Sequence, residues 1–251
     1  MEFRAYAKPD PATDLPEWNQ SICPAMSRRA TPRLQLLLTA IAVLLIVKVT
    51  GEVVLGYRNY FPPQFDTDFL RGRERYFFGG YQFAFYVHLI SGPLSLGLGL
   101  LLLSPRFRNR NLALHRKLGR LQAVNVLLLL TPSGIFMARH ALFGVHAAVA
   151  FWVLSVLTAA TIVLGWRAAV QRRFLDHQRW MMRNFVLLCS AITLRLLGGL
   201  ATVLDVQSSR FDLVASWASW VVPLALLECV LVFRNGREVC HRRKLGSGGW
   251  N

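Results

Sequence analysis

The chain has 251 residues, of which 54% are hydrophobic, and a formal net charge of +16. A soluble domain of this length rarely carries so many uninterrupted apolar runs, so the composition argues against a soluble protein. A charge of this size suggests nucleic acid as a partner in a soluble protein. Here the positions of the basic residues exclude that interpretation, as described below.

Apolar runs long enough to cross a bilayer recur along the chain after a proline-containing tail at residues 1–33. A span needs about 20 mostly apolar residues to cross roughly 30 Å of hydrocarbon. We therefore predict an all-α integral membrane bundle, with a four-helix core formed by spans two to five. The six spans are expected near residues 34–56, 79–103, 119–141, 143–166, 181–203 and 212–233, followed by a basic tail at 234–251.

The arginines and lysines gather at alternate ends of these runs. The clusters are Arg28, Arg29 and Arg33; Arg106, Arg108, Arg110, Arg116, Lys117 and Arg120; Arg167, Arg172, Arg173, Arg179 and Arg183; and Arg234, Arg237, Arg242, Arg243 and Lys244. If every run spans, all four clusters fall on one side, which the positive-inside rule identifies as the cytoplasm. We expect both termini on that side, with the lipid bilayer and the anionic lipids of its inner leaflet as partners and no nucleic acid.

The first outside loop, residues 57–78, is rich in aromatic side chains. Aromatic belts are common where spans leave the membrane, and this is the simpler interpretation of the loop. The alternative is a lid over a cavity that faces outward.

Besides Lys48, four ionisable residues fall within the outer half or the middle of the predicted spans: Glu52, His88, Arg139 and Arg195. Charged groups are costly in hydrocarbon and normally face the bundle interior or a water-filled cavity. Glu52 is the chief carboxylate at the depth of Arg195, so an ion pair between spans one and five is one expectation. The other is an outward-open polar pocket lined by all four residues.

Two segments place a histidine among arginines, each beside an apolar run. They are Leu114-His115-Arg116-Lys117-Leu118-Gly119-Arg120 and Asp176-His177-Gln178-Arg179-Trp180-Met181-Met182-Arg183. Spans two and three flank the first segment, and spans four and five flank the second, which is the pattern of a duplicated hairpin. Three interpretations remain open for His115 and His177: contact with lipid headgroups, a phosphate or other anion site, and axial ligation of a b-type haem.

These motifs in this order resemble a bacterial family of multi-pass membrane proteins that is known as a domain of unknown function. The resemblance covers roughly residues 80–202 and is carried by Tyr86-Val87-His88-Leu89-Ile90-Ser91-Gly92-Pro93-Leu94, the two histidine segments and Thr193-Leu194-Arg195-Leu196. Gln178 departs from the arginine that is typical there. The resemblance implies a location in the bacterial cytoplasmic membrane. It also marks five residues for testing: His88, His115, His177, Arg183 and Arg195. A looser similarity to membrane cytochromes b rests on bundle histidines alone.

Three hypotheses about function follow. The first is a membrane redox protein that holds one b-type haem or a quinone near His115 and His177, with haem iron as the only metal and with His88 as a further cofactor contact. The second is a transporter or receptor for a small anion or lipid. The third is an accessory subunit that stabilises a protein partner or a homo-oligomer. No spacing typical of a hydrolase, a zinc site or a nucleotide-binding loop is present in the sequence.

Overall fold

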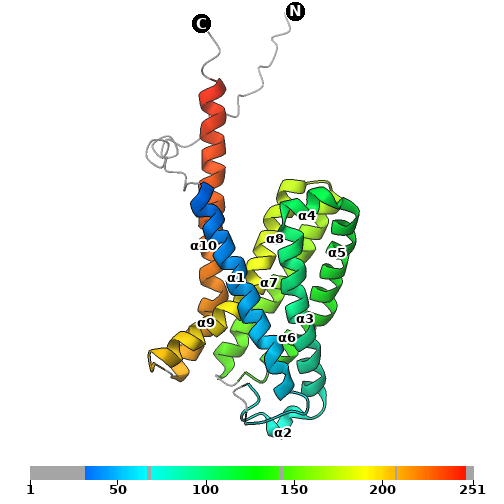
Figure 1. The fold of residues 1–251 in the computed structure, drawn as a ribbon, viewed down its shortest axis with the longest axis vertical. Helices are drawn as coiled ribbons and strands as arrows, with labels where there is room; N and C mark the ends of the chain where they lie inside the picture. Colours follow the sequence, from blue (N-terminus) through cyan, green and yellow to red (C-terminus); the bar gives the residue numbers. More distant parts are fainter. Residues whose placement is uncertain (1–31, 67–68, 142–143, 207, 247–251) are drawn as a thin grey trace, which may run out of the picture. The chain divides into compact units, whose positions relative to one another are not determined.

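The computed structural model describes residues 32–66, 69–141, 144–206 and 208–246, and helices dominate this part of the chain (Figure 1). Six stretches of it are long and apolar enough to cross a membrane. They are Leu36–Asn59, Gly80–Leu103, Leu112–Ala138, Gly144–Val170, Phe174–Val203 and Ser209–Phe233. The prediction of a six-span helical membrane protein is therefore confirmed.

The spans are built from helices with the following bounds. These are α1 (Pro32–Leu55), η2 (Gly56–Asn59), α2 (Glu74–Phe77), α3 (Gly80–Leu103), α4 (Pro105–Arg110), α5 (Leu112–Val124), η3 (Asn125–Leu130), α6 (Thr131–Ala138), α7 (Gly144–Val170), α8 (Phe174–Leu188), α9 (Ser190–Val203) and α10 (Ser209–Gly246). By backbone contacts the chain divides into two compact units. Residues 39–228 form one, and residues 1–38 with 229–251 form the other. All the sites described below lie in the unit of residues 39–228.

The core of this unit consists of four helices: α3, the continuous run α5–η3–α6, α7 and α8. Helix α3 packs on α5, η3, α6 and α8, while α7 packs on α5, η3, α6 and α8. Among the described elements, α5 and α8 each contact α3 and α7 but make no close backbone contact with each other. They therefore lie at diagonal positions in the bundle. This packing of four helices is the four-helix core that the sequence predicted.

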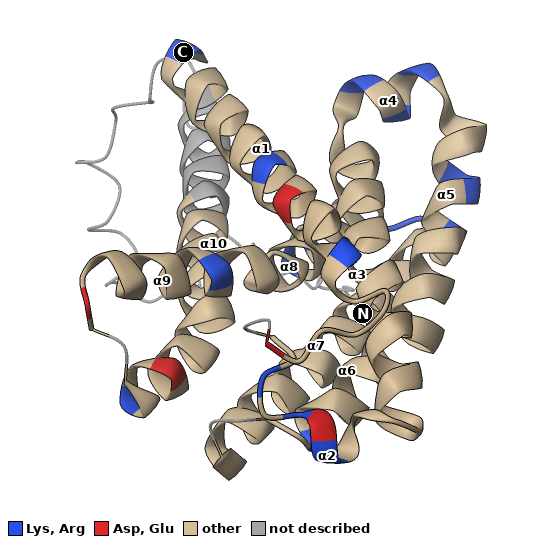
Figure 2. Cartoon of the chain, turned by 60° about the horizontal axis from the view of Figure 1, so that its bottom comes forward, with Lys and Arg blue, Asp and Glu red and all other residues tan. Residues whose placement is uncertain are grey.

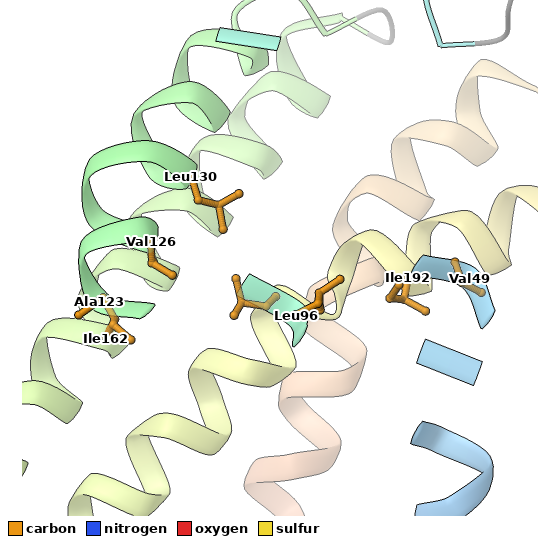
Figure 3. Close-up of a cluster of buried hydrophobic side chains, with 8 residues drawn as sticks. Val49, Leu96, Ala123, Val126, Leu130, Ile162 and Ile192 are labelled. Carbon is orange, nitrogen blue, oxygen red and sulfur yellow. The ribbon is translucent and has the colours of Figure 1, made fainter. Parts of the chain in front are cut away.

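A cluster of buried apolar side chains holds the bundle together (Figure 3). It contains Val49, Leu96, Ala123, Val126, Leu130, Ile162, Leu188 and Ile192. Between α3 and α8 the helices approach closely at Gly99. A Cβ built there lies 2.5 Å from Cδ2 of Phe185. Such close approach at a small residue is the usual way for helices to gain packing contacts within a membrane.

Each of the two hairpins in the core uses one buried asparagine to join its helices. Asn125 donates from Nδ2 to the Ser91 carbonyl at 3.0 Å and to Ser95 Oγ at 2.7 Å. Asn184 donates from Nδ2 to the Thr158 carbonyl at 2.8 Å and also to a threonine hydroxyl on α7. The same device therefore appears in the α3–α5 hairpin and in the α7–α8 hairpin, which agrees with the duplicated pattern in the sequence.

The fifth span is not a single straight helix. It breaks at Cys189, where α8 ends and α9 begins, and among the described elements α9 makes close backbone contact only with α8. A continuous helix would carry His177 and Arg195 on one face, because the two residues are 18 positions apart. The break turns α9 away from the α8 axis (Figure 1), so Arg195 does not share the face of α8 that carries His177.

Basic residues stand on α4 and on the first turns of α5 (Figure 2). They mark one end of the bundle, which we call the inner end because the charge pattern predicts that it faces the cytoplasm. The loop between η2 and α3 lies at the opposite end, which we call the outer end (Figure 1). Between the two ends the spans expose large apolar side chains, such as Phe83 and Val156, as expected for contact with lipid.

Candidate functional site

The principal candidate site is a partly enclosed cavity of about 330 Å³, which we call the outer cavity. It is lined by residues of α1, η2, the outer loop, α3, η3, α6, α7, α8, α9 and α10. Most of the lining is apolar. Its described lining includes two arginines, Arg73 and Arg195, together with His88, and contains no aspartate or glutamate.

The outer loop folds onto the end of α3 and forms one wall of this cavity. Leu70 and Phe77 are fully buried in an aromatic cluster with Tyr81 and Phe85. The Tyr86 hydroxyl donates to the Tyr60 carbonyl at 2.8 Å, which ties the loop to α3. The loop is therefore packed on α3, and its residues Tyr60, Phe69 and Arg73 form part of the cavity wall.

Arg73 is the charged group that this loop buries. Its side chain is only 8% exposed, and Nε donates to Tyr81 Oη at 3.0 Å. Its Nη1 donates to the Phe69 carbonyl, and the guanidinium carbon lies 4.5 Å from the centre of the Phe69 ring. Gly72 precedes it with φ of +74°, a backbone conformation that other residues rarely adopt. All these partners are neutral, and among the described residues no carboxylate forms an ion pair with Arg73.

His88 lies farther along the α3 wall of the cavity. Its Nδ1 is 3.1 Å from Ser133 Oγ, and that hydroxyl donates its own hydrogen to the Leu129 carbonyl at 2.6 Å. Ser133 can therefore only accept, so the network assigns the imidazole hydrogen to Nδ1. The lone pair of His88 is then on Nε2.

The expected outer pocket is only partly correct. His88 and Arg195 line the cavity, whereas Glu52 and Arg139 do not. Glu52 pairs instead with Lys48, one turn before it on α1, with 3.4 Å between Nζ and Oε1. The expected Glu52–Arg195 pair is therefore absent from the described residues, because a partner four positions away on the same helix is nearer. Arg139 is exposed at the end of α6.

His115 and His177 form the inner histidine pair. Each is the fourth residue of its helix, α5 and α8 respectively, so both lie near the inner end of the bundle. His177 Nδ1 lies 2.9 Å from the Gly165 carbonyl, and because a carbonyl only accepts, Nδ1 carries the hydrogen. His115 Nδ1 is buried without a hydrogen-bond partner. No group of three or more histidine, cysteine, aspartate or glutamate side chains that could hold a metal ion occurs in the described part of the chain.

Arg183, the other expected ligand or ion-pair residue, is already paired. Its Nε lies 2.5 Å and one of its terminal nitrogens 2.9 Å from the two carboxylate oxygens of Glu228 on α10. The guanidinium carbon lies 4.7 Å from the Trp180 ring centre. Both charges are satisfied, so this pair joins α8 to α10 and is not available to a ligand.

Two important residues were not singled out from the sequence. Glu228 is an acidic residue within the sixth span, and a carboxylate in that position indicates an ion pair with a neighbouring span. Arg73 stands in the outer loop among other charged residues, and only the folded loop reveals its burial. The glycine before it was the one local hint of a special backbone turn.

These features define a multi-pass helical membrane protein with a cation-lined cavity in its outer half. The chain belongs to the family described as "Predicted membrane protein (DUF2306)", which matches residues 85–231 and confirms the resemblance noted in the sequence. No curated protein and no solved structure matches the chain. The matched range includes His88, His115, His177 and Arg195, whereas Arg73 lies before it.

Proposed function

We propose that this protein is a receptor or transporter that binds a carboxylate or phosphate group in the outer cavity. The observation that carries the proposal is the burial of Arg73 against the cavity with neutral partners only. A buried charge is costly unless an opposite charge compensates it. An anion in the cavity supplies the charge that no described lining residue supplies.

The other polar groups of the cavity support the same choice of ligand. Arg195 provides a second guanidinium within a predicted span, where an unpaired charge marks a functional site by default. Planar guanidinium groups bind carboxylate and phosphate oxygens through two parallel hydrogen bonds. The lone pair on His88 Nε2 can accept a hydrogen bond from a ligand that carries a hydroxyl, such as a singly protonated phosphate.

Thermal unfolding of the detergent-solubilised full chain tests this proposal. The added anions are inorganic phosphate, sulfate and butyrate, compared at equal ionic strength. A bound anion stabilises the folded state in proportion to the logarithm of its concentration above Kd. We expect at least one of these anions to raise Tm, and Arg73→Gln and Arg195→Gln to abolish the increase.

Arg75→Gln is the matched control, because Arg75 stands two residues away, is exposed and does not line the cavity. It is expected to respond as the natural protein does. The proposal fails if no anion stabilises the natural protein, or if both arginine variants keep the full response. If Arg73→Gln does not fold, Arg195→Gln still tests the proposal. Arg195 is exposed and has no described hydrogen bond or ion pair that the substitution would remove.

A second candidate function is redox chemistry at the inner histidine pair. One observation favours it: the bond from His177 to Gly165 fixes the ring and leaves Nε2 as the ligating nitrogen, the usual arrangement of a metal-binding histidine. His115 is likewise the fourth residue of the diagonal helix, with a buried unpartnered nitrogen. One turn after it, a Cβ at Gly119 would meet nothing within 4 Å. These residues fit the axial ligands of one b-type haem, which when bound supplies one-electron transfer.

An optical spectrum of the full chain, expressed with haem available, tests this second candidate. We expect a Soret band that His115→Ala and His177→Ala each remove or shift. His146→Ala is the control, because His146 lies at the start of α7, at the outer end. A colourless natural protein with native helix content overturns the haem assignment and leaves the outer cavity proposal intact.

A further inference from the structure

The outer cavity is long in the direction of the helix axis. On α3 its lining extends from Tyr81 through His88 and Gly92 to Leu96. A rise of about 1.5 Å per residue makes this wall roughly 22 Å long. That is far longer than a phosphate ion or a short carboxylate.

The two ends of the cavity differ in chemistry. Arg73 and Tyr81 lie at its outer end, and His88 lies about 10 Å deeper by the same helical rise. Beyond His88 the α3 wall continues as Gly92 and Leu96, and the opposite wall includes Leu188 of α8. Leu96 and Leu188 belong to the apolar cluster of the bundle, so the deep end of the cavity opens onto an apolar surface (Figure 3).

Gly92 keeps this deep end open. A Cβ at Gly92 would meet no other atom within 4 Å, although the residue lines the cavity and is half-buried. The empty space beside Gly92 is therefore part of the cavity and is available to a ligand. A larger side chain at this position would fill that space without displacing a neighbouring residue.

The volume limits what fits. About 330 Å³ is at the low end of the range of about 300–1,000 Å³ that small-molecule sites occupy. Such a volume suits a single hydrocarbon chain with a compact head, and it is small for a lipid with two chains.

We infer that the ligand is a long, single-chain acid of the fatty-acid type. Its acidic head lies at the outer end of the cavity, beside Arg73, and its hydrocarbon chain extends inward past His88 and Gly92 toward Leu96. This inference rests on the proposed function of the outer cavity and adds the class of ligand to it. No bond is made or broken: the step is binding.

The dependence of affinity on chain length tests the inference. Apparent Kd values for butyrate, octanoate and dodecanoate come from the concentration dependence of Tm with the full chain in detergent. Each methylene that becomes buried multiplies the affinity by about fourfold. We therefore expect dodecanoate to bind at least about a hundredfold more tightly than butyrate, and dodecanol, which has no charge, to bind weakly.

Gly92→Leu is the decisive variant. It fills the apolar end, so we expect it to abolish the gain from chain length while butyrate binds as it does to the natural protein. Gly97→Leu is the matched control, because Gly97 is on the same helix, is exposed, has equal space and does not line the cavity. Arg73→Gln is expected to lose all three acids. An unchanged butyrate response shows that Gly92→Leu is folded.

The outcomes separate the two proposals. Equal affinity for butyrate and dodecanoate in the natural protein, or a full chain-length effect in Gly92→Leu, overturns the long-chain ligand and leaves anion binding intact. Binding of dodecanol as tight as that of dodecanoate also overturns it, because the head then contributes nothing. If no acid of any length binds, the proposed function fails together with the inference.

Discussion

The close approach of α3 and α8 at Gly99 leads to a prediction whose size follows from the structure. In Gly99→Ala the new Cβ lies 2.5 Å from Cδ2 and 2.9 Å from Cε2 of Phe185. Carbon atoms normally approach to about 3.5–4.0 Å, so the overlap is about 1 Å and involves a rigid ring. Overpacking of this kind costs about 1–3 kcal/mol, and the higher helix propensity of alanine returns up to about 1 kcal/mol. We expect a net loss of about 1–2 kcal/mol in the free energy of unfolding.

Thermal unfolding in detergent measures this loss. For a chain of this size, about 1 kcal/mol corresponds to roughly 2–4 °C, so Gly99→Ala is expected to lower Tm by about 2–8 °C. Gly97→Ala is the control, since its Cβ meets nothing within 4 Å, and it is expected to keep or slightly raise Tm. Phe185→Leu in the Gly99→Ala background should restore part of the loss. An unchanged Tm for Gly99→Ala, or no recovery in the double variant, would refute the claim that this contact limits the helix separation.

Three further results are expected from the same stability assay. Arg183→Met alone should lower Tm more than the double variant Arg183→Met, Glu228→Leu does, because the single variant leaves a carboxylate unpaired within a span. Equal losses in Tm would show that the ion pair contributes little to stability. Asn125→Leu, which removes two hydrogen bonds between helices, should cost about 1–2 kcal/mol, and a stabilised variant would contradict this. Gly72→Ala should lower the free energy of unfolding by roughly 1–2 kcal/mol because of its φ of +74°. It should also weaken the Tm response to anions. An intact response would show that the turn at Gly72 is not needed to position Arg73.

Hydropathy predicted the spans well and the helix starts less well. The second span was expected at 79–103, and α3 is Gly80–Leu103. The third was expected from residue 119, whereas α5 begins at Leu112. The difference has a physical cause: an apolar run marks what can lie in hydrocarbon, but a helix continues into water wherever its residues favour it. Arginine, lysine and leucine are good helix formers, so the basic segment around His115 is helical.

The candidate site was less predictable because it depends on contacts between distant parts of the chain. His88 and Arg195 were correctly selected as polar residues that line a cavity, since charged and polar groups within spans avoid lipid. Glu52 was wrongly paired with Arg195, because depth alone does not distinguish a distant partner from Lys48 one turn away. The burial of Arg73 depends on how the outer loop folds onto α3, and no pattern in the loop sequence specifies that fold.

The two candidate sites are far apart, and this makes them independent in a testable way. His88 bonds to Ser133, and His115 stands 18 residues before Ser133 on the continuous run α5–η3–α6, a distance of about 27 Å along the helix. The deep end of the cavity at Leu96 is about 12 Å closer to the histidine pair than His88 is, which leaves about 15 Å, and the buried side chain of Ala123 lies on the same run in between. A ligand of the outer cavity therefore does not reach the inner histidine pair. We expect Arg73→Gln to leave any haem spectrum unchanged and His177→Ala to leave the anion response of Tm unchanged. A spectrum that shifts when a long-chain acid binds would show instead that the bundle couples the two sites.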